Sequence, residues 1–307
     1  MKSVVITGAT SMLGISLINE CVKNKIFVLA LVRKNSCNIS LIPKSNFVQI
    51  VEISLRNYKD FSFNLAIKYD VFFHLAWEYS NRESRNDCCL QKSNIDYTLD
   101  SVYLAYSLGC SKYVFAGSQA EYGIKQELIN PDTSINPNTA YGVAKYSAEQ
   151  FSKIMCQQLG IQHVATRIFS VYGINDRLDS MVNYCILNLF KGIPPKLTKC
   201  EQRWDYLFSE DAGKALKLIG EHGKNLAVYC LASGASRSLY EYVKIIEKVV
   251  ASNVKVKFGA KCCVTSNIGQ LQACTDNLRK DTGFVVETSF EEGITKTFNW
   301  LKERHLL

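Results

Sequence analysis

The sequence predicts an α/β protein in which a doubly wound parallel sheet is followed by a smaller α+β lobe. Short apolar runs alternate with helical patterns from Val4 to Phe169, which is typical of a parallel sheet with right-handed crossovers. A glycine-bearing turn joins the first apolar run to the first helical pattern. After Gly173 the alternation ends, and helical segments with isolated strands take its place. This change predicts the second lobe.

The composition is that of an ordinary globular protein with room for one large domain or two lobes. Of the 307 residues, 47% are hydrophobic and 21% are charged, and the formal net charge is +8. This charge suits an anionic ligand, but it is not concentrated in an arm or stripe, so we expect no nucleic acid partner. No apolar run is long enough to span a membrane. The 12 cysteines and 4 histidines show no zinc-ligand spacing, so we expect a cytoplasmic protein with reduced thiols and no metal.

The first predicted strand, Val4–Ile6, leads through the glycine-bearing turn into a helix from about Met12 to Lys23. Strand, turn and helix in this order place a pyrophosphate at a helix N-terminus. Gly8 would form the tight turn, and Gly14 would let the helix pack closely on the strand. A plain β–α turn is the alternative interpretation. The predicted cofactor contacts of the turn are Gly8, Thr10, Ser11, Met12, Leu13 and Gly14.

The next two predicted strands, Ile26–Val32 and Phe47–Val51, end in residues suited to the adenosine half of a dinucleotide. Arg33 directly follows the first of them. An acidic residue there would bind the ribose hydroxyls of NAD, whereas a cation accepts the 2′-phosphate of NADP. Arg33 therefore favours NADP over NAD, although basic residues at solvated strand ends are common. Glu52, at the exit of the second strand, is placed to meet the adenine amino group, and Ile53 is a further predicted cofactor contact.

Further strands are predicted over 71–77, 113–118 and 164–169. Ligands of open parallel sheets bind at the carboxyl ends of the strands, which makes Ser118 a candidate site residue. His74 lies inside an apolar run, and we interpret it as a hydrogen-bonded core histidine rather than a base. A long helical pattern over 86–108 carries Asn94 near its middle.

Tyr141 and Lys145 lie four residues apart at the start of another helical pattern, so they share one face of that helix. An ammonium beside a phenol favours the phenolate and lowers the pKa of the phenol. The spacing alone proves little, because Tyr240 and Lys244 repeat it further along the chain. Only the first pair follows a strand that ends in a serine, so the second pair is interpreted as an ordinary surface pair.

Several short segments follow the glycine-bearing turn over 7–14 in a fixed order. They are His74-Leu75-Ala76, Asn94, 117–123, Tyr141 with Lys145, 167–173, Arg203-Trp204-Asp205-Tyr206 with Glu210-Asp211, and Cys274-Thr275-Asp276 leading to Gly283-Phe284. In this order and spacing the chain resembles the extended short-chain dehydrogenase/reductase family, in particular its nucleoside-diphosphate-sugar epimerases, dehydratases and ketoreductases. The resemblance covers nearly the whole chain.

The resemblance implies a Rossmann lobe, formed by residues 1–169 and about 204–235, and a substrate lobe formed by about 170–203 and 236–307. In the implied catalytic group, Ser118 binds the reacting oxygen and Tyr141 exchanges its proton. Lys145 lowers the pKa of Tyr141 and binds the nicotinamide ribose, and Asn94 orients Lys145 through a water molecule. The remaining implied cofactor contacts are Leu75, Ala76, Trp77, Tyr141, Lys145 and Ile168.

The resemblance also implies a nucleoside-diphosphate sugar as substrate. Its implied contacts are Ser118, Gln119, Ser170, Arg203 and Arg279, with Arg203 as the first candidate for the pyrophosphate and Arg279 as the second. Three departures from the family pattern bear on function. Ser11 replaces the middle glycine of the turn, Trp77 replaces a small residue and would narrow the pocket, and Gln119 stands where a dehydratase carries an acid, which disfavours dehydration.

Three hypotheses follow for the function. The first is an NADPH-dependent reductase of a nucleoside-diphosphate-4-keto-sugar, because Arg33 favours NADP and a net reductase consumes NADPH. The alternative is a nucleoside-diphosphate-sugar 4-epimerase that holds NAD tightly. A cofactor-sensing module without turnover is disfavoured, because Tyr141 and Lys145 are both present. The resemblance further suggests a homodimer formed through the helices near 86–108 and 141–158.

Overall fold

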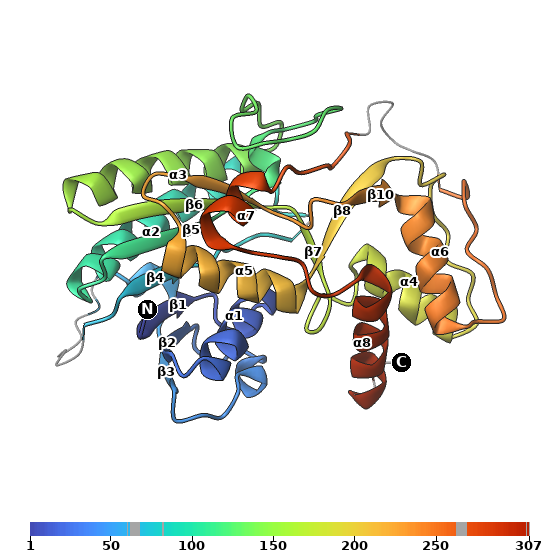
Figure 1. Ribbon diagram of the computed structural model, residues 1–307, viewed down its shortest axis with the longest axis horizontal. Helices are drawn as coiled ribbons and strands as arrows, with labels where there is room; N and C mark the ends of the chain where they lie inside the picture. The colour runs from blue at the N-terminus through green and yellow to red at the C-terminus, as the bar shows by residue number, and fades with distance from the viewer. Residues whose placement is uncertain (60, 62–67, 82, 262–268, 305, 307) are drawn as a thin grey trace.

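A seven-stranded parallel sheet forms the larger part of the computed structural model, which describes residues 1–59, 61, 68–81, 83–261, 269–304 and 306 (Figure 1). The strand order is β3-β2-β1-β4-β5-β6-β9. The strands are β1 (Ser3–Thr7), β2 (Phe27–Val32), β3 (Val48–Glu52), β4 (Val71–His74), β5 (Lys112–Ser118), β6 (Gln162–Ile168) and β9 (Val228–Leu231). The order reverses direction between β1 and β4, and such a reversal opens the crevice in which these sheets bind ligands. The predicted doubly wound sheet is confirmed.

Helices cover both faces of this sheet (Figure 1). On one face α1 (Met12–Lys23) packs against α5 (Ser209–His222), and on the other α2 (Cys88–Ser107) packs against α3 (Ala140–Gln158). Neighbouring residues of β1 are buried toward opposite faces: Val4 and Ile6 share a core with α1 and α5, whereas Val5 shares one with α2 and α3. Because both faces are covered, the central strands β1, β2 and β4 are mostly apolar.

Side chains cap the first turn of three of these helices. Ser11 accepts a hydrogen bond from Gly14 N at 3.0 Å, and Thr139 accepts one from Gly142 N at 3.1 Å. Asp87 caps α2 in the same way. Hydroxyl and carboxylate caps satisfy amides that have no intrahelical acceptor. The caps of α1 and α3 therefore fix where the helices that carry the turn and the Tyr141–Lys145 pair begin.

A smaller sheet, in the order β10-β8-β7, forms the second lobe. Its strands are β7 (Ser170–Tyr172), β8 (Arg203–Phe208) and β10 (Ser236–Ser238). The helices α4 (Met181–Phe190), α6 (Leu239–Val250) and α8 (Phe290–Glu303) pack around an aromatic core that includes Tyr172, Tyr206 and Phe290. The lobe boundaries drawn from the sequence stay a prediction.

The remaining elements are short. They are the 3-10 helices η1 (Ile39–Leu41), η2 (Leu55–Asn57) and η3 (Gln119–Glu121), and the helix α7 (Asp276–Thr282). The helix α7 packs against α5 and β9, so Leu278 shares the core of the large sheet. None of the described helices is long and apolar enough to cross a membrane. The cysteines of the described part are free thiols, and Cys262 and Cys263 lie outside it.

The contact between α1 and α5 depends on a missing side chain at Gly213. A Cβ at this position would lie 2.5 Å from the main chain of Ser16. We expect Gly213→Ala to lower the free energy of unfolding by about 1–3 kcal/mol, because the two helices would have to separate. Urea unfolding measures the effect, with Glu210→Ala on the exposed side of α5 as control. Equal unfolding midpoints for Gly213→Ala and the wild type would contradict this account.

Candidate active site

The turn after β1 is held against the end of β4. Gly8 has a positive φ of 65°, and a Cβ there would lie 2.8 Å from Ala76 N. The Thr7 hydroxyl accepts hydrogen bonds from Leu75 N and Ala76 N, each at 3.1 Å. A Cβ at Gly14 would lie 2.3 Å from Gly8 O, so the helix start also packs directly on the turn. The turn therefore tolerates no side chain at either glycine.

The N-terminus of α1 fits the pyrophosphate of a dinucleotide. Amides of the first turn of a helix have no intrahelical acceptor and bind anions. Ser11 replaces the usual glycine, and its hydroxyl accepts a hydrogen bond from the Gly14 amide. The amides of Met12 and Leu13 remain for a phosphate. The serine hydroxyl therefore caps one amide of the first turn and stabilises the helix start.

The predicted adenosine contacts lie at the ends of β2 and β3. Arg33 is exposed immediately after β2 and forms no ion pair with the residues that the structure describes. The Ser36 hydroxyl donates to Thr10 Oγ1 at 3.1 Å, which ties the following segment to the glycine-bearing turn. Glu52 is exposed at the end of β3, and Ile53 is buried beside it.

The three residues Ser118, Tyr141 and Lys145 come together at the carboxyl end of β5. Ser118 is the last residue of β5, and its hydroxyl acts to lower the pKa of the Tyr141 phenol. Lys145, one turn further along α3, is buried and donates a hydrogen bond to Ala116 O at 2.6 Å. Its Nζ lies 5.9 Å from the centre of the Tyr141 ring. The arrangement matches a site in which a hydroxyl and a phenol face one reacting oxygen.

Burial and neighbouring charges perturb both titratable groups of this site. Burial lowers the pKa of Lys145 to about 7, against the pull of the Glu121 carboxylate and with a further lowering by Arg85. Burial raises the pKa of Tyr141, while Arg85 and the Ser118 hydroxyl act in the opposite direction. Strong perturbation by burial together with specific partners is typical of catalytic groups.

Trp77 packs against both Lys145 and Tyr141. Its ring lies 3.8 Å from Lys145 Nζ and meets the Tyr141 ring edge to face at 5.9 Å. The indole N–H donates to Gln91 Oε1 at 3.0 Å, which fixes the ring. An aromatic face stabilises a desolvated ammonium, so Trp77 supports the buried Lys145.

Asn94 and His74 are buried, and both form hydrogen bonds within the large lobe. Asn94 accepts from Glu78 N at 2.8 Å and donates to Glu78 O at 3.2 Å, and no direct hydrogen bond to Lys145 occurs among the described residues. The water-mediated role predicted for Asn94 stays a prediction. His74 is buried between hydroxyls of Thr7 and Thr98, and burial, with Lys145 nearby, lowers its pKa to about 3. It is the core histidine that the sequence predicted.

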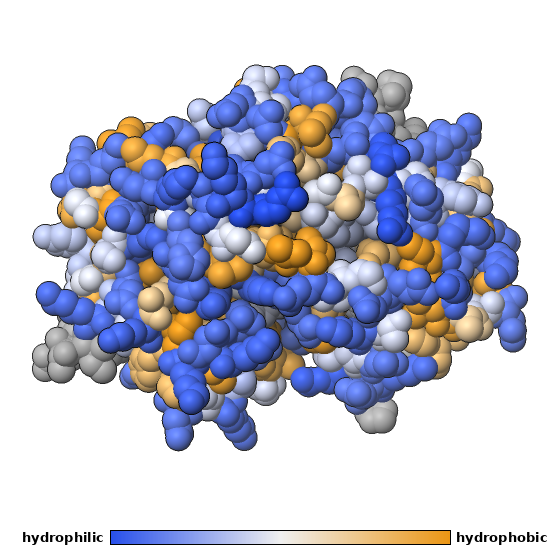
Figure 2. All heavy atoms as spheres, in the orientation of Figure 1, coloured by the Kyte–Doolittle hydropathy of each residue, from blue (hydrophilic) through white to orange (hydrophobic). Residues whose placement is uncertain are grey.

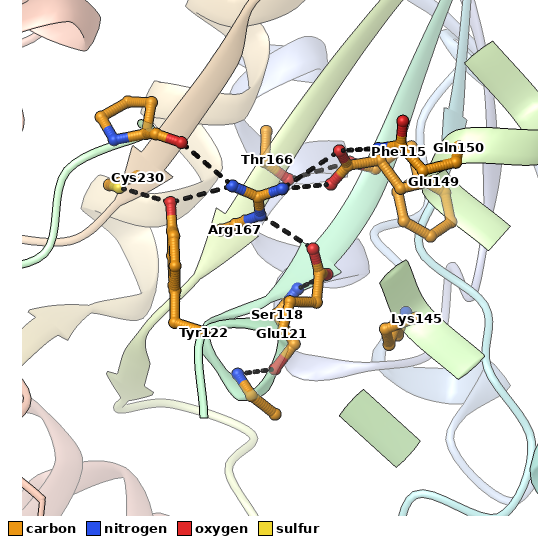
Figure 3. Close-up of polar contacts among 12 residues, drawn as sticks. Phe115, Ser118, Glu121, Tyr122, Lys145, Glu149, Gln150, Thr166, Arg167 and Cys230 are labelled. Atoms are coloured by element: carbon orange, nitrogen blue, oxygen red, sulfur yellow. Dashed lines mark hydrogen bonds and ion pairs between the residues drawn. The ribbon is translucent and has the colours of Figure 1, made fainter. Parts of the chain in front are cut away.

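A buried ion network lies directly behind Ser118 (Figure 3), and sequence reasoning assigned it no role. Arg167 donates from Nε to Glu121 Oε2 at 2.8 Å and from Nη2 to Glu149 Oε1 at 3.2 Å. Glu121 also accepts the Ser118 amide at 2.6 Å. A sequence signal existed, because Glu121 and Arg167 lie within segments that carry the family resemblance, but neither spacing nor periodicity joins them.

The predicted substrate contacts lie farther apart than Ser118, Tyr141 and Lys145. Gln119 begins η3 next to Ser118, and Ile168 ends β6. Ser170, in β7, accepts a hydrogen bond from the Trp204 indole at 2.7 Å, and the Arg203 guanidinium donates to Ser236. Arg279 is exposed on α7, and its ion pair is with Asp276 at 3.0 Å. The structure therefore ties Arg203 and Ser170 to the small sheet and places Arg279 on the large lobe.

Fold and site together define an enzyme of the extended short-chain dehydrogenase/reductase type. The chain belongs to the NAD dependent epimerase/dehydratase family, whose profile matches residues 4–232. An uncharacterized UDP-glucose epimerase of Bacillus subtilis is 25% identical over 314 residues, which cover 97% of this chain and 97% of that protein. A UDP-glucuronate 4-epimerase of Thermodesulfobacterium geofontis is 24% identical and covers 85% of this chain and 82% of that protein.

Solved structures confirm the fold. A UDP-N-acetylglucosamine 4-epimerase from Methanobrevibacter ruminantium superposes with a TM-score of 0.87 at 23% identity, over 99% of both chains. A UDP-glucuronic acid 4-epimerase from Bacillus cereus, solved with UDP-glucuronic acid and NAD, superposes with a TM-score of 0.83 at 19% identity, over 98% of this chain and 99% of that one. The predicted family and enzyme class are confirmed.

Removing the cation of the buried network should destabilise the fold. We expect Arg167→Met to lower the free energy of unfolding by about 3–5 kcal/mol, because Glu121 and Glu149 would remain buried without their partner. Burial raises the pKa of Glu149 to about 8, and Arg167 opposes this shift. A folded state that binds more protons than the unfolded chain loses stability as the pH rises. Without Arg167 the pKa of Glu149 should rise further, so the loss in Arg167→Met should be larger at about pH 8.5 than at about pH 5.5.

The matched control is Arg177→Met, which breaks an exposed ion pair with Asp179. Exposed pairs contribute only about 0–1 kcal/mol. Urea unfolding of both variants at the two pH values makes the comparison. Equal losses for the two variants, or a loss from Arg167→Met that does not depend on pH, would contradict the account of the network.

Proposed function

We propose that this protein is a nucleoside-diphosphate-sugar 4-epimerase that works with a tightly held NAD. The observation that carries the proposal is the meeting of Ser118, Tyr141 and Lys145 at the carboxyl end of β5. This end of the sheet also holds the glycine-bearing turn, whose Gly8 touches the end of β4. These positions support a proton-exchanging phenol beside the crevice in which such sheets bind dinucleotides.

The names of the similar proteins support an epimerase over the NADPH-dependent reductase, which was the first hypothesis from the sequence. The Bacillus subtilis, Thermodesulfobacterium geofontis and Methanobrevibacter ruminantium proteins are all named epimerases of UDP-linked sugars. The Bacillus cereus enzyme was solved with NAD. These names favour a UDP-sugar and NAD for this chain.

In the proposed reaction, bound NAD supplies the hydride chemistry. The Tyr141 oxygen would accept the proton of the sugar 4-hydroxyl while C4 is oxidised to a ketone. It would return a proton to the same oxygen when the hydride comes back to the opposite face of C4. Ser118 donates a hydrogen bond to the same sugar oxygen. A proton transferred by a positioned group contributes about 10²–10⁴-fold to the rate. Lys145 would leave its bond with Ala116 O to bind the nicotinamide ribose.

The second lobe would hold the nucleotide half of the substrate. Arg203 remains our first candidate for the pyrophosphate, because it is exposed at the start of β8 and its guanidinium is held by Ser236. Arg279 is a weaker candidate, because it is already paired with Asp276 on α7. Ser170 and Gln119 are proposed to contact the sugar. These assignments rest on position in the fold and on the family resemblance.

One observation still favours the NADPH-dependent reductase of a 4-keto-sugar as a second candidate. Arg33 is exposed and without an ion pair among the described residues at the place where the 2′-phosphate of NADP would lie. Identification of the cofactor released on denaturation separates the two functions. Stoichiometric NAD supports the epimerase, whereas a preparation without cofactor that oxidises NADPH with a 4-keto-sugar supports the reductase.

The epimerase assay follows the conversion of UDP-glucose, UDP-N-acetylglucosamine and UDP-glucuronate into their 4-epimers. We expect Tyr141→Phe to lower the rate on the active substrate by at least about 10²-fold, because the proton acceptor is lost. The matched control is Tyr240→Phe, which removes a hydroxyl from the other Tyr–Lys pair, on α6. The assignment of Tyr141 would be wrong if both variants turned over like the wild type.

We also propose a homodimer through the outer face of α2 and α3. Tyr103, Tyr106, Phe151 and Ile154 are each more than half exposed on these two helices, and Figure 2 shows apolar side chains on the surface above them. Exposed apolar patches of this kind mark interaction sites. A second copy of the chain would cover this face with the same residues.

We expect Ile154→Glu to convert the dimer into a monomer, because a carboxylate would be buried in an apolar interface. The control is Ile193→Glu, because Ile193 is 52% exposed against 53% for Ile154 and lies after α4. Analytical ultracentrifugation gives the mass of each variant. A wild-type protein that sediments as a monomer, or a dimer that survives Ile154→Glu, would rule out this interface.

A further inference from the structure

The segment before α2 is built onto the start of α3. Asn86 Oδ1 accepts a hydrogen bond from Ala140 N at 3.3 Å, and Arg85 O accepts one from Tyr141 N at 3.0 Å. Thr139 takes the next amide, that of Gly142. The first three amides of α3 therefore have acceptors, and two of these come from a segment more than 50 residues away in sequence.

This attachment places the Arg85 guanidinium over the Tyr141 ring. The Arg85 Cζ lies 4.1 Å from the ring centre, and the side chain is half-buried. The Lys145 Nζ lies farther away, at 5.9 Å, and is directed to Ala116 O and the Trp77 ring. Among the described residues, the cation nearest to the centre of the Tyr141 ring is thus the arginine and not the lysine.

Three charged side chains face the phenol from three elements. Arg85 comes from the segment before α2, Lys145 from α3 and Glu121 from η3, and the neutral Ser118 hydroxyl completes the surroundings. A guanidinium stays charged at every pH at which proteins are folded. The Lys145 ammonium does not, because burial lowers its pKa to about 7. The Glu121 carboxylate opposes the phenolate.

We propose that Arg85 is a positioning residue of the active site, which holds the Tyr141 ring by stacking and supplies the constant positive charge that favours its phenolate. The inference rests on the proposed role of Tyr141 as the proton acceptor. In this proposal, Lys145 shares the stabilisation of the Tyr141 phenolate with Arg85 and can bind the ribose. A cation over an aromatic face within about 6 Å is attracted to the ring, and an opposite charge this close stabilises an anion.

The geometry separates this role from a purely structural one. The hydrogen bond from Tyr141 N ends on the main-chain carbonyl of residue 85, and the second cap is supplied by Asn86. A substitution of the Arg85 side chain therefore leaves both caps of α3 in place. Only the charge and the stacking over the ring are lost.

The test is a direct titration of Tyr141 in the protein as purified, with the cofactor that it retains. Tyrosine labelled with ¹³C at Cζ gives one resonance per ring, and the signal absent from Tyr141→Phe identifies residue 141. The variants are Arg85→Gln, Arg85→Lys and Arg304→Gln, the last of which removes the same charge at the end of α8. Spectra are recorded from about pH 6 to about pH 12.5, because the midpoint is expected above the ordinary tyrosine value near 10.

We expect Arg85→Gln to move the titration of Tyr141 upward by about one pH unit, which lowers its phenolate fraction about tenfold at any pH below the midpoint. Arg85→Lys should restore most of the wild-type titration, and Arg304→Gln should not change it. Lys145 is present in all of these variants, so its own titration does not account for a difference between them.

An Arg85→Gln titration that coincides with the wild type overturns the proposal. An equal shift in Arg304→Gln also overturns it, because the effect would then belong to the overall charge. The measurement uses no sugar substrate, so it stands if the epimerase assay fails. A loss of turnover in Arg85→Gln without a change in the titration would assign Arg85 to substrate binding and likewise refute the proposed role.

Discussion

The Arg167 guanidinium, buried between two carboxylates, is the interaction on which the catalytic end of the sheet depends. It joins β6 to η3 through Glu121 and to α3 through Glu149. Glu121 in turn accepts the Ser118 amide, and α3 carries Tyr141 and Lys145. A buried ion pair contributes little net stability, but a single geometry satisfies it. The network therefore acts by fixing where Ser118, Tyr141 and Lys145, the three proposed catalytic side chains, meet.

Neighbouring groups, including Glu121 of this network, offset the effect of burial on the pKa values of Lys145 and Tyr141. Burial lowers the pKa of Lys145 to about 7 and raises the pKa of Tyr141, and both shifts oppose the charged forms that proton exchange requires. The Glu121 carboxylate favours the ammonium, the Trp77 ring lies against it, and the Arg85 guanidinium favours the phenolate. The site is thus a set of compensating charges in which no single pair explains the titration of Tyr141.

Periodicity and turn chemistry predicted most of the large sheet. The helix Met12–Lys23 was predicted with its observed bounds. The Tyr141–Lys145 pair was predictable because its two members lie one helical turn apart. Contacts such as Arg85 over Tyr141 and Glu121 with Arg167 join residues separated by 56 and 46 positions. Only the folded arrangement of loops and helices brings these residues together, so no local sequence pattern predicts the contacts.

A carboxylate and an arginine at the end of β2 differ in how strongly each one indicates the cofactor. A carboxylate at the end of β2 would bind the ribose hydroxyls of NAD and repel the 2′-phosphate of NADP, so it would exclude NADP. Arg33 excludes neither, because it is exposed and has no ion pair among the described residues, and it can extend into solvent when NAD is bound. A solvated arginine costs little free energy in either state. Arg33 therefore permits NADP without requiring it, and the epimerase names of the similar proteins weigh more heavily in the proposal of NAD.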